Sequence, residues 1–395
     1  MNSKKDSRLS RRDFLKSGSL ILTNLLVYPI LKPVDPLNIL APDDRKRIYI
    51  APDDHTDYFW AGSEEQYRQA FLSMIDYYLD LADKYSSNPT EFQSRWNCDG
   101  SFWLWVYENN KTAAEFQRLI DRIRDGHISF PLTPLVLCQG GAPAEAVLRG
   151  MYYAGSIERR YNLRVRLAVA MENQTLPYGL GMLWAGSGAK YSWRGICGCD
   201  SQVPGAWDRE KEIYWWEGMD GSRILMKWQS MLGNMPGVIA AQSIGGYAEA
   251  RNPADVVEYV DKDPLFQARY PYTIIGAFGN GWDDLQTYTE EFVTTAIAKT
   301  NANRLVLVSN EQDFFEDFEN TYGPGLSSQS CSFGNEWDLY VASLAEVSAS
   351  VKRSVEKLRS AEALAALVSL QKAGFMSRRA EDRKRAWINL GLYWE

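Results

Sequence analysis

The amino-acid sequence predicts an α/β protein in which a parallel sheet or barrel is followed by a helical bundle. Two observations lead to this fold class. Short apolar segments alternate with longer amphipathic segments up to about residue 336, and only helical periodicity continues beyond it. Alternating strands and helices join parallel strands through right-handed crossovers. The 395 residues suffice for one large domain and a smaller one.

The individual elements follow one another in the order that this alternation requires. Strands are expected in RKRIYIAP (45–52), EFQSRWN (91–97), HISFPLTPL (127–135), RVRLAVAM (164–171), RILMKW (223–228), YTIIGAFG (272–279) and RLVLVS (304–309). Helices are expected in SEEQYRQAFLSMIDYYLDLADKYS (63–86), TAAEFQRLIDRIRDG (112–126), APAEAVLRGMYYAGSIERRYN (142–162) and TLPYGLGMLWAGSG (175–188). The chain therefore divides into a barrel domain at 33–336 and a helical domain at 337–395.

The N-terminal segment 1–32 has the features of a twin-arginine export signal. The sequence SRRDFLK at 10–16 precedes the apolar run SGSLILTNLLVYPIL, and Lys4 and Lys5 lie upstream. This run is shorter than the roughly 20 residues that a membrane-spanning helix needs, so we expect a signal that is cleaved or that anchors loosely. The predicted location is periplasmic or extracellular, reached through the twin-arginine translocase.

Composition excludes some classes of partner and favours others. The net charge of −7 provides no basic surface for nucleic acid. The 14 Trp and 22 Tyr residues suit a site that stacks on sugar rings, although a large core also accommodates many aromatic side chains. Five cysteines without a C-x-x-C pair indicate buried thiols instead of a disulfide framework: Cys98, Cys138, Cys197, Cys199 and Cys331.

A candidate metal site lies at the end of the first strand. In an extended segment alternate side chains share one side, so His55 and Asp57 point the same way just beyond residues 45–52. Functional sites of α/β sheets and barrels lie at these carboxyl ends. An imidazole nitrogen and a carboxylate oxygen supply two of the four ligands that Zn²⁺ prefers. The alternative is that His55 caps a turn and Asp57 caps the following helix.

Carboxylates follow two other expected strands. Glu172 comes directly after 164–171, and Asp283 and Asp284 come after 272–279 on a Gly-rich turn. Retaining glycoside hydrolysis needs two carboxyl groups roughly 5 to 5.5 Å apart. Each carboxylate taken alone could instead cap a helix or lie solvated in a loop. Three such strand ends in an aromatic-rich chain together favour a carbohydrate-active site.

The sequence resembles the N-terminal region of glycoside hydrolase family 38, the metal-dependent retaining α-mannosidases. HTDYFW matches the H-x-D-x-x-W motif of that family, and four further stretches resemble it: MENQTLPYGLGMLWAGSGAKY, WWEGMDGSRIL, GNGWDDLQ and VEKLRSAEALAAL. The resemblance extends from about residue 46 to residue 395. It implies a (β/α)7-type barrel of parallel strands followed by a C-terminal three-helix bundle, acting on α-mannosides.

The resemblance also implies a role for individual residues. His55, Asp57 and Glu172 correspond to ligands of one Zn²⁺ per chain, and Glu172 stands at the nucleophile position, where the family has Asp. Asp284 corresponds to the acid/base, with Asp283 as its close rival. The residues implied to contact the sugar are Trp60, Tyr58 and Trp282.

Two departures from the family leave other functions open. The family's fourth metal ligand is a histidine near the end of the bundle, whereas the only other histidine here is His127, far from that position. The C-terminal β-rich region of the family is also absent, so we expect a fragment that ends short of the ligand; a natural truncation is the alternative. A deacetylase or another metal-dependent carbohydrate hydrolase, or an inactive carbohydrate-binding homologue, would fit the same residues.

Overall fold

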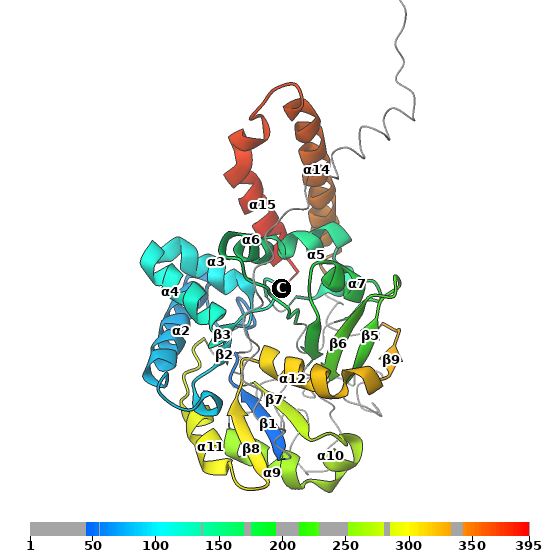
Figure 1. Ribbon diagram of the computed structural model, residues 1–395. Coiled ribbons are helices and arrows are strands. Elements are labelled where there is room, and N and C mark those ends of the chain that lie inside the picture. The colour runs from blue at the N-terminus through cyan, green and yellow to red at the C-terminus, as the bar shows by residue number, and fades with distance from the viewer. Residues whose placement is uncertain are drawn as a thin grey trace, which may run out of the picture. The chain divides into compact units, whose positions relative to one another are not determined.

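The computed structural model describes residues 45–54, 56–135, 137–169, 175–194, 213–228, 252–279, 285–332 and 343–394. Within these ranges the strands form three sheets (Figure 1). The first has the order β7-β1-β8 and is parallel throughout: β1 (Lys46–Ala51) pairs with β7 (Ile274–Phe278) and β8 (Arg304–Val308). Alternating β and α elements with parallel pairing confirm the α/β class.

The other two sheets are shorter or mixed. The second sheet pairs β2 (Trp96–Asn97) with β3 (Ile128–Ser129) in parallel. The third has the order β4-β6-β5-β9, with the bounds Tyr191–Arg194, Arg223–Trp228, Ile213–Glu217 and Ser328–Gln329. Here β5 runs antiparallel to β6, so the expectation of an all-parallel arrangement is wrong for this pair. The cause is a tight turn at 218–222, where Gly221 has a φ of 79° and Asp220 accepts from the Ser222 amide.

Helices cover these sheets. Their bounds are α2 Glu64–Lys84, α3 Ser101–Asn110, α4 Ala113–Arg124, α5 Ala144–Gly150, α6 Tyr152–Tyr161, α7 Leu180–Gly186, α9 Pro253–Lys262, α10 Pro264–Arg269, α11 Glu291–Lys299, α12 Gln312–Tyr322, α14 Ala345–Ser369 and α15 Ala380–Leu392. Short 3-10 turns lie at Thr90–Phe92, Gln139–Gly141, Gly323–Gly325 and Met376–Arg379. Capping boxes begin α2, at Ser63 with Gln66, and α4, at Thr112 with Glu115.

Several expected strands are shorter in the structure, and proline interrupts one of them. The expected strand 127–135 is limited to Ile128–Ser129, since Pro131 and Pro134 lack the N–H that a strand pair needs. The segment 91–97 begins as part of a 3-10 turn after Pro89 and becomes extended only at Trp96. The described part of 164–171 pairs through a single bridge between Leu167 and Tyr191.

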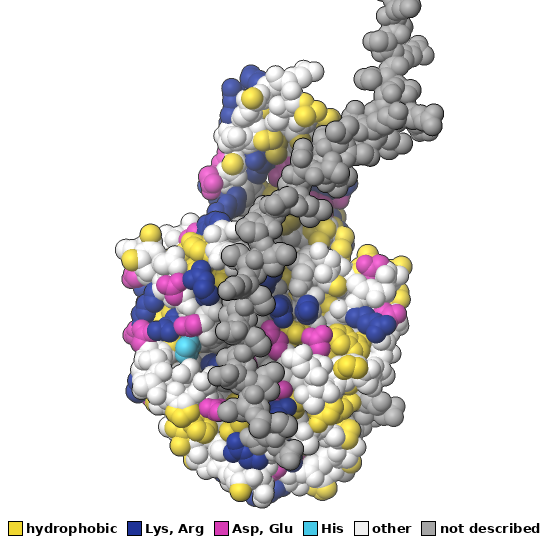
Figure 2. Space-filling model, in the orientation of Figure 1, with side chains coloured by type: hydrophobic (Ala, Val, Ile, Leu, Met, Phe, Trp, Pro, Cys, Tyr) yellow, Lys and Arg dark blue, Asp and Glu magenta, His cyan; other side chains and the backbone are white. Residues whose placement is uncertain are grey.

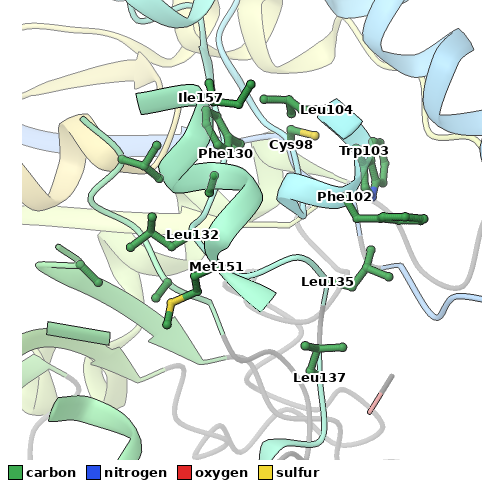
Figure 3. Packing of buried hydrophobic residues seen from close by; sticks show 14 of the residues in the cluster. Cys98, Phe102, Trp103, Leu104, Phe130, Leu132, Leu135, Leu137, Met151 and Ile157 are labelled. Atoms are coloured by element: carbon green, nitrogen blue, oxygen red, sulfur yellow. The ribbon is translucent and has the colours of Figure 1, made fainter. Parts of the chain in front are cut away.

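Most of the described tryptophans serve the core. Trp96, Trp103, Trp184, Trp193, Trp216 and Trp394 are among the largest fully buried side chains. Trp96 stacks on Tyr78 with ring centroids 4.5 Å apart, and Trp103 stacks on Phe71 at 4.3 Å. Figure 3 shows Trp103 and Phe102 of α3 in the same buried cluster as Cys98. Core packing therefore accounts for much of the aromatic composition.

The helical region after β9 contains α14 and α15 lying side by side (Figure 1). It is tied to earlier parts of the chain by an Arg149–Glu362 ion pair of 2.7 Å and by the Cys138 amide, which donates to the Trp394 carbonyl at 2.6 Å. Cys98 is a buried free thiol, Cys138 and Cys331 are half-buried, and Cys197 and Cys199 lie outside the described residues. Among the helices that the structure describes, none combines the length and apolar character needed to cross a membrane.

Candidate functional site

Four buried carboxyl groups follow strands of the parallel sheets at their carboxyl ends. Asp53 and Asp54 come after β1, Asp99 after β2, and Glu311 after β8. Each of the four residues is no more than 2% exposed. Parallel strands that end at one edge bring their following residues together, which explains why carboxylates distant in sequence meet here. These four residues were not predicted as site residues, although two sequence signals point to them: the pair Asp53-Asp54 directly after the apolar run, and Asn310-Glu311 directly after 304–309.

The backbone at Glu311 is held in an unusual conformation. Its φ of 70° and ψ of −47° are those of a γ-turn, closed by the Gln312 amide donating to the Asn310 carbonyl at 2.9 Å. Such a conformation is strained for a residue with a Cβ and persists only where surrounding contacts enforce it. Here the Glu311 amide donates to the Ser309 hydroxyl at 2.9 Å, and Trp193 Nε1 donates to Glu311 Oε2 at 2.6 Å. The turn therefore fixes this carboxyl group inside the protein.

Burial sets the electrostatics of this cluster. It raises the pKa of Asp53 well above the usual range, and the charge of Glu311 raises it further. Burial also raises the pKa of Glu311, although its hydrogen bonds partly oppose the change. Two buried carboxyl groups that repel one another favour a state with at least one proton bound. The buried cations Arg194, at the end of β4, and Lys227, near the end of β6, lie at the carboxyl ends of the neighbouring sheet.

Asp54 and Asp99 anchor the segment that carries the HTDYFW motif. The Thr56 amide donates to Asp99 Oδ2 at 3.1 Å, and the Thr287 hydroxyl donates to Asp54 Oδ1 at 2.6 Å. A turn follows, in which the Trp60 amide donates to the Asp57 carbonyl at 3.0 Å. Thr56 is therefore attached to a buried acid, and the turn places Phe59 and Trp60 at the surface.

The structure separates the aromatic residues of this motif. Tyr58 is buried in a cluster with Phe71 and Phe102, and its hydroxyl lies 3.4 Å from Glu64. Trp60 is 73% exposed at the surface. Asp57, which precedes Tyr58, is half-buried. The Trp60 ring is therefore open to solvent, whereas the Tyr58 ring is packed in the core.

The remaining predicted site residues are placed as follows. His55, Glu172, Trp282, Asp283 and Asp284 lie outside the described residues. His127 hydrogen-bonds Asp125 at 2.6 Å in the turn between α4 and β3. Within the described ranges, no group of three or more His, Cys, Asp or Glu side chains is arranged to hold a metal ion. The proposed metal ligands and carboxylate catalysts thus stay predictions.

Comparisons with solved structures define the class of the fold. No protein-family model matches the chain, and no curated protein matches its sequence. The structure is similar to an alpha-mannosidase from Enterococcus faecalis V583, with a TM-score of 0.55 and 14% identity over 73% of this chain and 31% of that one. A glycosyl hydrolase family 38 protein from Enterococcus faecalis has a TM-score of 0.53 and 16% identity, over 89% and 39% respectively.

A third similar structure is the 4-alpha-glucanotransferase from Thermococcus litoralis, with a TM-score of 0.50 and 12% identity over 85% of this chain and 48% of that one. The chain therefore has an α/β fold of the class found in these carbohydrate-active enzymes. More particularly, its fold is like that of glycoside hydrolase family 38, which confirms the resemblance at the level of the fold. The chain spans less than half the length of each of these three proteins.

Proposed function

We propose that this protein is a metal-dependent retaining glycoside hydrolase that cleaves α-mannosides. The observation that carries the proposal is the position of the HTDYFW segment. It follows β1 at the carboxyl edge of a fold like that of family 38, and Thr56 anchors it to the buried Asp99. The proposal includes the (β/α)7-type barrel, the three-helix bundle, and export through the twin-arginine pathway to the periplasm or the cell exterior.

The donor set suits one Zn²⁺ per chain. Asp57 presents a half-buried carboxylate at this edge, and oxygen and imidazole donors are the ligands that zinc takes in catalytic sites. His55, Asp57 and Glu172 would hold the ion, with a fourth protein ligand outside this sequence. When bound, the ion polarises sugar hydroxyl groups as a Lewis acid.

The chain's own carboxyl groups carry the proposed chemistry. Glu172 attacks the anomeric carbon and forms a covalent glycosyl ester. Asp284, or its neighbour Asp283, protonates the leaving oxygen and then accepts a proton from the water that releases the sugar. Trp60, Tyr58 and Trp282 are the proposed sugar contacts. Trp60 has the exposed ring that stacking on a sugar requires, whereas Tyr58 would contribute through the position of its neighbours.

Zinc content and hydrolysis of an activated α-mannoside test the proposal. We expect about one zinc per chain, lost in His55→Ala, because the ligand set is then incomplete. Glu172→Gln should keep the metal's other ligands and lower hydrolysis at least about a thousandfold, the scale seen when a nucleophile is removed. Glu356→Gln is the matched control, since this exposed residue of α14 pairs only with Arg359 among the described residues.

Three outcomes would contradict the proposal, each in a different way. Wild-type hydrolysis by Glu172→Gln would exclude this residue as the nucleophile. Acetate release from acetylated sugars without glycosidic cleavage would show a deacetylase. Sugar binding that persists after chelation, with no turnover, would show a carbohydrate-binding protein.

A further inference from the structure

A cavity of about 330 Å³ lies where α15 meets α3, α5 and α6. Figure 1 shows these helices gathered at the base of the α14–α15 pair, away from the β1–β8 sheet. The volume of the cavity falls in the range of pockets that enclose small organic ligands. We propose that this cavity binds a small amphipathic anion, with an apolar body inside and its acidic group at the rim near Arg159 and Lys384. The inference goes beyond the proposed function and does not depend on it.

The walls of the cavity are largely apolar. Phe102 and Trp105 of α3 stack with ring centroids 5.4 Å apart, and Trp387 of α15, only 8% exposed, lies on another side. Gly391 leaves open space in the lining, since an added Cβ would meet no atom within 4 Å. An apolar ligand body would therefore replace water against these surfaces without displacing a side chain.

Two of the lining cations are already neutralised. Arg149 pairs with Glu145 at 2.8 Å and with Glu362 at 2.7 Å, and its guanidinium lies 4.6 Å from the ring centroids of both Tyr152 and Trp387. Arg383 lies 3.5 Å from the same Glu362. These contacts hold the helices around the cavity together, and they neutralise Glu362, the one acidic residue that lines it among the described residues.

Two further cations are left to bind a ligand. Arg159 of α6 and Lys384 of α15 also line the cavity, and both are exposed. Neither has an acidic partner within ion-pair distance among the residues that the structure describes. Figure 2 shows Lys and Arg side chains along the α15 side of the α14–α15 pair. The excess of positive charge beside an apolar cavity favours an anion over a neutral sugar or alcohol.

Calorimetric titration of the full chain with decanoate and decanol tests the inference. Decanoate and decanol share the apolar body, and only decanoate carries the acidic group. We expect decanoate to bind at one site, and the double variant Arg159→Gln, Lys384→Gln to bind it about tenfold more weakly, as expected for lost charged contacts. Both positions are exposed, so the double variant should fold. Higher salt should weaken decanoate binding to the wild type more than to the double variant.

A cavity-filling variant supplies the second measurement. Gly391→Leu should lower decanoate affinity at least about tenfold by occupying the cavity. Gly186→Leu is the matched control, because Gly186 also lies in the last turn of a helix with open space at its Cβ position, but outside the cavity. Equal affinity for decanoate and decanol would overturn the anion assignment. Unchanged decanoate affinity in Gly391→Leu, or no decanoate binding to the wild type, would overturn the site itself.

Discussion

Acidic residues at the two ends of the sheet β7-β1-β8 lie in opposite electrostatic surroundings. At the amino end, Arg304 donates to Glu258 and to Asp261 at 2.7 Å each, and Lys46 donates to Asp261 at 2.8 Å. At the carboxyl end, Asp53 and Glu311 are buried against one another's charge. The same strands therefore join a region of paired charges to a region of opposed charges.

The pKa values follow this difference. Hydrogen bonds from Lys262, Arg304 and Lys299 lower the pKa of Glu258 to about 2. Burial instead raises the pKa of Glu311. A carboxyl group whose pKa is lowered by folding stabilises the protein above its unfolded pKa, and one whose pKa is raised destabilises it there. The amino end thus contributes stability at neutral pH, and the carboxyl end costs stability, as expected of a functional edge.

The largest change in the free energy of unfolding is expected when the charge network at the amino end of the sheet is broken. Arg304→Ala should lower the free energy of unfolding by about 3 kcal/mol at pH 7, because it leaves two partly buried carboxylates without their shared cation. Urea unfolding measures the change. Arg359→Ala is the control, since its pair with Glu356 is exposed and should contribute little to the free energy of unfolding. Equal losses in the two variants would remove the distinction between the network and an ordinary surface pair.

The second prediction concerns the carboxyl end of the sheet, where the free energy of unfolding should change in the opposite direction. Glu311→Gln should raise the free energy of unfolding by about 1 to 2 kcal/mol at pH 8, because the amide needs no proton and can still accept from Trp193. The folded pKa is raised, so the penalty in the wild type is absent below the unfolded pKa and grows as the pH rises toward the folded value. The gain should therefore disappear near pH 4. A gain that is equal at pH 4 and pH 8 would show a packing effect instead.

The sequence predicted the strands of this sheet well, but the buried acids that follow them were not predicted. Apolar runs such as 45–52 and 304–309 are readable because burial on both faces leaves a continuous pattern. Glu311 was not predicted, because its place depends on a γ-turn whose contact with Trp193 joins residues 118 positions apart. The short pair β2–β3 was also overestimated in length, since local apolar character does not show where proline ends a ladder.

The smallest effect concerns the turn that carries the motif outward. Phe59 has a φ of 79° at the third position of the turn 57–60, where glycine is favoured and other residues are strained. Its ring is 53% exposed, so little packing compensates for the strain. Phe59→Gly should therefore be more stable than Phe59→Ala by about 1 kcal/mol in thermal or urea unfolding, since both remove the ring and only glycine relieves the backbone.

Activity in the same two variants connects this strain to the site. If the strained turn serves to present Trp60, Phe59→Ala should retain more hydrolysis of the activated α-mannoside than Phe59→Gly, although Phe59→Gly is the more stable of the two. Equal activities would mean that the conformation of this turn is incidental to the site. The carboxyl end of the sheet thus combines a strained, exposed Phe59 with buried acids, and both features cost stability. Such costs are expected where selection acts on function. The paired charges at the amino end are instead what selection for stability would favour.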